Sequence, residues 1–154
     1  IDNLLRGMTV DTAVIASFGL ILKLPAIRAC RRIINFHPGD IEYFRGRHPL
    51  PQTILNGWPE MAISAHMIDS ESIDAGPILG RLLLPIDYKK DYATNYGRLL
   101  DSLPSFAHLI LKDVLNGSSY QRPFIPKRHT YYPPIERSAL EPIMQAATLQ
   151  EYCQ

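Results

Sequence analysis

Three side chains that could take part in acid–base chemistry stand at two places in the sequence, Asn35 and His37 in one stretch and Asp74 in another. An amide can donate to a developing negative charge, an imidazole can donate or take up a proton, and a carboxylate can accept one. Alternate residues of a β-strand share a face, so Asn35 and His37 project to the same side while Phe36 points to the other. Pro38 then ends the strand because it has no backbone N–H to donate. This pattern predicts a polar site at the end of an apolar strand.

Each of these residues also has an ordinary structural interpretation. A histidine at the end of a strand is often only hydrogen-bonded, and an aspartate such as Asp74, which precedes Ala75, Gly76 and Pro77, is a common turn former. Open parallel sheets, however, form their ligand crevices at the carboxyl ends of strands. That location favours a functional site, and the structural interpretation of each single residue stays open.

Composition limits the class of protein. The 154 residues are 46% hydrophobic and 20% charged, which is enough for one globular core. A formal net charge of +1 offers no broad basic field, so electrostatics alone do not indicate a nucleic-acid partner. Cys30 and Cys153 lack metal-ligand spacing and fit free thiols in a reducing, cytoplasmic compartment. No apolar run is long enough to span a bilayer, and we expect neither a membrane partner nor a metal site.

Hydrophobic periodicity predicts the elements that would position the polar groups. Short apolar runs predict strands at residues 12–17, 32–36, 62–68 and 78–86. Proline-led and amphipathic segments predict helices at residues 25–31, 49–55, 91–115 and 138–152. The third of these helices carries an apolar stripe, interrupted by Pro104, that we expect in the core: Tyr96, Leu99, Leu100, Leu103, Phe106, Leu109, Ile110 and Val114. The loop between the last two strands contains Asp74 and is long enough to reach the crevice.

The residues around these groups resemble a known family. Residues 35–46 read NFHPGDIEYFRG and residues 62–79 read AISAHMIDSESIDAGPIL. This combination is similar to the formyltransferase family, whose members use 10-formyltetrahydrofolate to formylate an amine and carry an N-x-H-P motif followed by a D-x-G-P/D loop. Residues 17–22, SFGLIL, also resemble the segment with which the family holds the pteridine. The resemblance runs from about residue 11 to residue 117.

The resemblance implies catalytic roles for Asn35, His37 and Asp74. Asn35 and a positively charged His37 would donate N–H bonds to the oxyanion that forms on the formyl oxygen. Asp74 would favour the charged imidazole and accept the proton of the amine. His66 is expected to make a hydrogen bond near the site without taking part in catalysis.

The resemblance also implies binding residues for the folate co-substrate, 10-formyltetrahydrofolate, and for the acceptor. Apolar side chains would hold the pteridine on one side: Leu20, Ile21 and Leu22. The loop before Asp74 would cover its other edge: Ser70, Glu71, Ser72 and Ile73. Three residues are candidates for binding the acceptor or the folate tail, with a solvated loop as an equal alternative: Arg45, Arg47 and His48.

The implied fold is α/β, a Rossmann-like open, mostly parallel sheet with flanking helices that is incomplete at its N-terminus, because further strand and helix units precede this point in the family. Residues 1–117 would form the C-terminal portion of the catalytic domain, and residues 118–154 a Pro/Tyr-rich tail with a terminal helix. In that tail we expect the segment from Tyr131 to Pro134 to serve packing.

The partners implied are folate and a small amine, with amino sugars attached to nucleotides favoured as the acceptor. Residues 39–44, GDIEYF, depart from the common family loop, and the loop before Asp74 is longer than in some members. These departures leave the acceptor open. A 10-formyltetrahydrofolate hydrolase, a methionyl-tRNA formyltransferase and a folate-binding remnant without turnover remain alternatives, of which only the second has a nucleic-acid partner.

Overall fold

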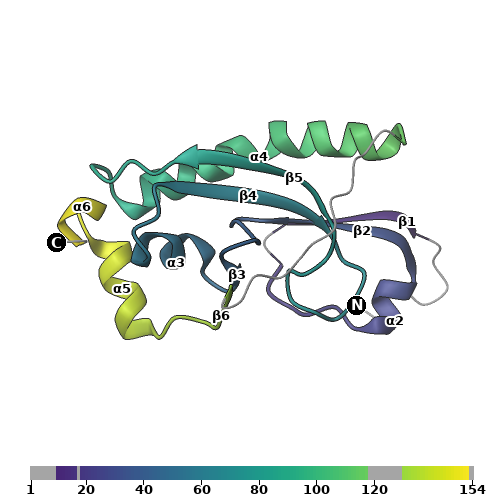
Figure 1. The fold of residues 1–154 in the computed structure, drawn as a ribbon, viewed down its shortest axis with the longest axis horizontal. Helices are drawn as coiled ribbons and strands as arrows, with labels where there is room; N and C mark the ends of the chain where they lie inside the picture. The colour runs from purple at the N-terminus through teal and green to yellow at the C-terminus, as the bar shows by residue number, and fades with distance from the viewer. Residues whose placement is uncertain (1–9, 17, 118–129, 153–154) are drawn as a thin grey trace.

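A computed structural model of the chain describes residues 10–16, 18–117 and 130–152. Its main sheet has four strands in the spatial order β1-β2-β4-β5: β1 (Val10–Ala16), β2 (Cys30–His37), β4 (Glu60–Met67) and β5 (Ile78–Pro85). β1 and β2 run parallel, whereas β2 pairs antiparallel with β4 and β4 antiparallel with β5. The predicted open α/β sheet is confirmed, and its described strands pair in a mixed pattern (Figure 1).

Helices flank this sheet on both sides (Figure 1). The long helix α4 (Tyr92–Leu115) lies along one face, and α2 (Leu24–Arg28) and α3 (Pro49–Leu55) lie on the other. Phe36 of β2 packs edge-on against Phe106 of α4, with ring centroids 6.0 Å apart. Because side chains alternate along β2, its neighbours Asn35 and His37 face away from α4. The apolar core joins α4 to the sheet and also includes Leu50 and Ile54 of α3, whereas Asn35 and His37 lie on the face of β2 opposite Phe36.

The β1–α2–β2 crossover is shorter in its helix and longer in its second strand than predicted. The helix expected at residues 25–31 ends at Arg28, and β2 begins at Cys30. Arg31 and Arg32 therefore lie in the strand, where their guanidinium groups contact the Asp11 carboxylate of β1 at 3.1 and 2.7 Å. The extension pairs Cys30 with Val10 and Arg32 with Thr12 in the parallel ladder of β1 and β2. Ser17, the predicted end of the first strand, lies outside the described residues.

Helix α4 confirms the helix predicted at residues 91–115 and corrects the extent of its apolar stripe. The helix continues through Pro104. Pro104 is exposed, so the carbonyl of Leu100, which loses its N–H partner, lies on the side that faces water. Leu100 and Leu109 were predicted in the core but are 39% and 60% exposed, because the buried stripe is narrower than the sequence pattern.

The tail folds back onto the rest of the chain. Strand β6 (Tyr131–Tyr132) pairs parallel with β3 (Arg45–Gly46) to form a separate two-stranded sheet. The single terminal helix predicted at residues 138–152 is instead two helices, α5 (Arg137–Gln145) and α6 (Leu149–Tyr152). The break arises because the Leu149 and Gln150 N–H groups donate to the carbonyls of Lys90 and Tyr88. The first part of the predicted tail, residues 118–129, lies outside the described residues.

Candidate active site

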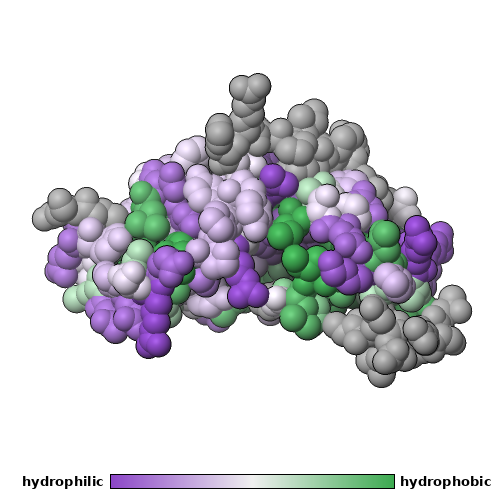
Figure 2. Space-filling view, turned by 90° about the horizontal axis from the view of Figure 1, so that it is seen from below, coloured by the Kyte–Doolittle hydropathy of each residue, from purple (hydrophilic) through white to green (hydrophobic). Residues whose placement is uncertain are grey.

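A cavity of about 680 Å³ opens at the C-terminal end of β2, on the side that Figure 2 views, and Tyr92 and Tyr96 of α4 also line it. It lies between residues 18–23, the loop at residues 70–74 and the C-terminal end of β2. Figure 2 views the molecule from this side and shows apolar and polar side chains meeting around a hollow near its middle. The volume falls within the usual range for small-molecule sites.

Strand pairing brings two of the polar groups together. Asn35 of β2 lies directly opposite His66 of β4, so both side chains share one face. Asn35 Nδ2 is 3.0 Å from His66 Nε2, and His66 Nδ1 is 2.9 Å from the Met67 carbonyl oxygen. A carbonyl only accepts, so Nδ1 carries the hydrogen and Nε2 is the atom that faces Asn35. In the neutral ring, Nε2 accepts a hydrogen bond from the amide, and in the charged ring Nε2 carries a hydrogen that can be donated to Asp74.

Asp74 arrives on the loop that joins β4 to β5. Its backbone has a φ of 47°, a left-handed conformation that aspartate tolerates better than most residues. The same loop passes so close to β4 that a Cβ on Gly76 would lie 1.8 Å from the Met67 carbonyl oxygen. The Met67 N–H closes the loop by donating to the Pro77 carbonyl at 2.8 Å. A constrained loop of this kind holds the carboxylate in place.

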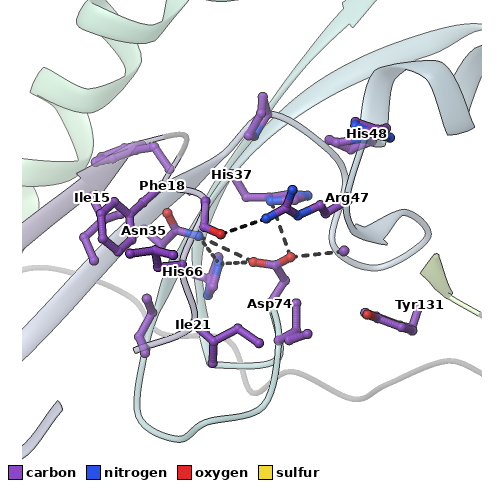
Figure 3. Close-up of a pocket in the computed structure, with 18 of the residues that line it drawn as sticks. Ile15, Phe18, Ile21, Asn35, His37, Arg47, His48, His66, Asp74 and Tyr131 are labelled. Carbon is purple, nitrogen blue, oxygen red and sulfur yellow. Dashed lines mark hydrogen bonds and ion pairs between the residues drawn. The ribbon is translucent and has the colours of Figure 1, made fainter. Parts of the chain in front are cut away.

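The Asp74 carboxylate is the centre of the cluster (Figure 3). Four nitrogen atoms surround it: Gly46 N at 3.0 Å, and Asn35 Nδ2, His37 Nδ1 and His66 Nε2 at 3.5 Å each. Burial raises the pKa of Asp74, but the two histidines and the Gly46 N–H outweigh burial and hold that pKa below its usual value. Asp74 is therefore negatively charged at neutral pH.

His37 lies at the buried end of the cluster, with its side chain 8% exposed. Its Nδ1 is 3.5 Å from Asp74 Oδ2, and its Nε2 is 3.4 Å from the Phe44 carbonyl oxygen. Burial lowers the pKa of His37, and the opposing attraction of Asp74 does not restore it. The free protein therefore holds a neutral imidazole, in contrast to the charged one expected from the sequence.

All seven residues predicted to bind folate line the cavity. Leu20 and Ile21 are 68% and 53% exposed on one rim, as apolar side chains that a flat ring could cover. The loop with Ser70, Ser72 and Ile73 forms the other rim. Glu71 belongs to that loop, but its carboxylate reaches across to the first rim, 2.9 Å from the Leu24 N and 3.2 Å from Lys23 Nζ. Glu71 thus joins the two rims.

The three predicted acceptor residues have different surroundings. Arg47 and His48 line the cavity, but Arg45 does not. Arg45 turns toward the tail and the Asp74 loop, with Nε 3.2 Å from Thr130 Oγ1 and Nη1 3.5 Å from the Ile73 carbonyl oxygen. His48 Nδ1 accepts a hydrogen bond from the Ile135 N–H at 3.1 Å. Arg45 therefore links β3 to the tail and to the Asp74 loop, and His48 links the start of α3 to the tail.

His66 makes the hydrogen bond near the site that the sequence predicts, and it also lies 3.5 Å from Asp74. Its contact with Asn35 depends on the register in which β2 pairs with β4. Tyr131 was expected to serve packing, yet it also lines the cavity. Nothing local to Tyr131 in the sequence indicates that position, because it depends on the pairing of β6 with β3.

Within residues 10–16, 18–117 and 130–152, no cluster of three or more His, Cys, Asp or Glu side chains is arranged to hold a metal ion. No helix in the same ranges combines the length and apolar character needed to cross a bilayer. In the described cluster, the Asn35 amide is able to donate a hydrogen bond, and Asp74 and His37 are close enough to share a proton.

Curated proteins with similar sequences are methionyl-tRNA formyltransferases. The protein from Wolbachia sp. subsp. Drosophila simulans (strain wRi) is 36% identical over 119 residues, which cover 77% of this chain and 38% of the relative. The protein from Wolbachia pipientis subsp. Culex pipiens (strain wPip) is 35% identical over 114 residues, 73% of this chain and 36% of the relative. The chain thus spans well under half the length of these relatives.

Solved structures share the fold at lower sequence identity. The formyltransferase PseJ from Anoxybacillus kamchatkensis, in complex with UDP-4,6-dideoxy-4-formamido-L-AltNAc and tetrahydrofolate, gives a TM-score of 0.79 at 20% identity and covers 92% of this chain and 76% of its own. HypX from Aquifex aeolicus, in complex with tetrahydrofolic acid, gives a TM-score of 0.71 at 18% identity, with coverage of 84% and 22%. The family model described as "Formyl transferase" matches residues 1–111. This match, together with the sequence relatives, shows that the chain belongs to the formyl transferase family.

Proposed function

We propose that this site transfers the formyl group of 10-formyltetrahydrofolate to the primary amine of a small, nucleotide-linked amino sugar. The observation that carries the proposal is the charged Asp74 carboxylate, which contacts Asn35, His37, His66 and Gly46 at the edge of a cavity with apolar rims. The family supplies the reaction type, and the residues supply the groups that the reaction needs.

Formyl transfer requires stabilisation of a negative charge. When a neutral amine attacks the formyl carbon, a tetrahedral intermediate forms and the formyl oxygen becomes negative. Asn35 Nδ2 can donate an N–H bond to this oxygen, because its hydrogen bond to Asp74, at 3.5 Å, is long and weak. Turning that N–H from Asp74 to the formyl oxygen would therefore cost little hydrogen-bond energy. The shorter contact with His66, at 3.0 Å, keeps the amide oriented meanwhile.

The reaction also requires removal of a proton from the attacking nitrogen. Asp74 is charged and His37 is neutral, so the pair can accept that proton when the intermediate forms. Asp74 then stabilises the positive imidazole that results, and the protonated pair can donate to the oxyanion. When the intermediate collapses, the bond from the formyl carbon to the folate nitrogen breaks, and that nitrogen takes the proton that the Asp74–His37 pair accepted from the amine.

The cavity fits the folate co-substrate. The exposed Leu20 and Ile21 side chains offer an apolar surface on one rim, and the opposite loop offers backbone and hydroxyl groups. Such a slot suits a flat heterocycle with polar edges. Glu71 would hold the rims at a fixed spacing through its contacts with Lys23 and Leu24.

Two observations bear on the acceptor. A cavity of about 680 Å³ suits a small molecule, and PseJ, which covers 92% of this chain, was crystallised with a UDP-linked sugar. These favour the nucleotide-linked amine. The second candidate is an aminoacyl-tRNA, favoured by the 36% identity to a methionyl-tRNA formyltransferase. For location, we propose a reducing cytoplasmic compartment, in which a free thiol such as that of Cys30 stays reduced.

The test is incubation of the chain with 10-formyltetrahydrofolate and one acceptor at a time, followed by measurement of tetrahydrofolate release and of the acceptor's mass. The proposal predicts release that depends on a UDP- or dTDP-linked amino sugar, with one formyl group added to it. Formylation of methionyl-tRNA alone would support the second candidate. Release without any amine would indicate a hydrolase, and folate binding without release would indicate a remnant. Either of these last results would refute formyl transfer.

A further inference from the structure

The corner of the cavity beside Asp74 is built by the tail. Backbone hydrogen bonds run from the Arg45 N–H to the Thr130 carbonyl at 2.8 Å and from the Arg47 N–H to the Tyr132 carbonyl at 3.3 Å. The ring of Tyr132 stacks on Phe44 at 5.7 Å. These contacts fix β6 against β3, although β6 lies beyond residues 1–111, which the family model matches.

Tyr131 faces the cavity from this corner. In a strand, neighbouring side chains point to opposite sides, so the packing of Tyr132 on Phe44 turns Tyr131 the other way. Its side chain is 46% exposed and lines the cavity, and Figure 3 shows its hydroxyl directed toward the Asp74 side. The Tyr131 ring packs against the backbone of Gly46, because a Cβ added to Gly46 would lie 3.1 Å from Tyr131 Cε2. Gly46 in turn donates its N–H to Asp74.

Arg47 provides a positive charge in the lining of the same cavity. Its Nη2 donates to the Gly19 carbonyl at 2.9 Å, so the side chain extends across the cavity (Figure 3). Among the described residues Arg47 has no carboxylate within ion-pair distance, unlike Lys23, which is paired with Glu71. An exposed guanidinium without a neutralising carboxylate attracts a phosphate, which it can bind with two parallel hydrogen bonds.

We propose that Tyr131 and Arg47 form the acceptor subsite, in which Tyr131 packs on the ring that carries the reacting amine and Arg47 binds the phosphate attached to that ring. The inference rests on the proposed function and adds two specificity-determining residues to it. An aromatic side chain offers a flat apolar face to a sugar ring, and the Arg47 cation selects a phosphorylated one. Phosphate binding would replace the Arg47 contact with Gly19.

The first test compares steady-state kinetics of Tyr131→Ala, Tyr131→Phe and the unmodified chain with a UDP-linked amino sugar. We expect Tyr131→Ala to raise the acceptor KM about fivefold to tenfold, with little change in the KM for 10-formyltetrahydrofolate. Tyr131→Phe keeps the ring and should retain a nearly normal KM. Leu109→Ala is the matched control, because Leu109 is 60% exposed on α4 and does not line the cavity. An unchanged acceptor KM in Tyr131→Ala, or an equal rise in the Phe variant, would overturn the role of the ring.

The second test needs no turnover and uses UDP as the probe in isothermal titration calorimetry. Arg47→Gln should weaken UDP binding about tenfold. Arg137→Gln, which removes the same charge from α5, should leave binding unchanged. Failure of UDP to bind the unmodified chain, or equal binding by Arg47→Gln, would overturn the subsite. Because this measurement is independent of formyl transfer, it can fail while transfer to another amine is observed, and it can succeed where transfer is absent.

Discussion

Replacing Gly46 with alanine should separate the tail from the active site. Gly46 has a φ of 102°, and a Cβ there would lie 2.2 Å from the Tyr132 carbonyl oxygen. Neither the strand backbone nor the new methyl group can yield easily, so β6 must move away from β3. The Gly46 N–H that holds Asp74 at 3.0 Å would move with it.

The expected loss of stability can be worked out from two contributions. Backbone strain at a positive φ costs about 1–3 kcal/mol for a residue with a side chain. The two backbone hydrogen bonds between β3 and the tail contribute about 0.5–1.5 kcal/mol each. Their loss brings the total to about 2–6 kcal/mol. Gly57→Ala is the matched control: it has a φ of 62° but nothing within 4 Å of an added Cβ, so it should lose only about 1 kcal/mol.

The assay is urea unfolding followed by the fluorescence of Trp58, the single tryptophan. The ring centroid of Trp58 lies 5.1 Å from that of Tyr43 and 5.6 Å from that of Phe44. Because Tyr132 of the tail stacks on Phe44, the fluorescence of Trp58 reports on this region. Formyl transfer measured on the same samples should fall about tenfold or more in Gly46→Ala and stay near normal in Gly57→Ala. Equal losses of stability and equal turnover in the two variants would refute the claim that β6 supports the site.

Two further predictions concern the histidines. His66→Leu should lower the free energy of unfolding in urea by about 0.5–1.5 kcal/mol, because the partly buried Met67 carbonyl loses its N–H donor. The same variant should lower turnover, because Asn35 loses the contact that orients its amide, and unchanged turnover would indicate a purely structural role for His66. Because burial lowers the pKa of His37 below 6.5, the unfolded chain binds more protons near pH 6, and the free energy of unfolding should fall as the pH drops below about 6.5. His37→Gln should flatten this part of the stability profile measured between pH 7 and pH 5, and an identical profile in the variant would contradict a buried neutral His37.

The alternation of residues along β2 was enough to predict that Asn35 and His37 share a face, and Pro38 was enough to predict the strand end. The motif resemblance added Asp74, whose approach to His37 at 3.5 Å depends on the long loop after β4. Hydrophobic runs predicted all four strands of the main sheet to within a few residues. These features are local, so the chain sequence carries them directly.

The rest depends on long-range pairing. Asn35 meets His66 because β2 and β4 pair antiparallel in one particular register, which no local pattern specifies. Tyr131 lines the cavity because the tail pairs with β3. The two segments are far apart in the sequence: Arg45 and Thr130, which are in contact, are separated by 85 residues. The neutral state of His37 follows from its burial, which the sequence does not state. Local patterns therefore predicted the catalytic candidates, and tertiary structure decided their partners and charge.

The most direct measurement of the central claim is single-turnover formyl transfer by Asp74→Asn, a variant of nearly equal size that loses the negative charge. With saturating 10-formyltetrahydrofolate and a UDP-linked amino sugar, we expect the rate to fall about a hundredfold or more, because the positive imidazole that forms on His37 loses the carboxylate that stabilises it. Folate binding and the urea midpoint should remain close to those of the unmodified chain. A folded Asp74→Asn variant that transfers the formyl group at a near-normal rate would contradict the account.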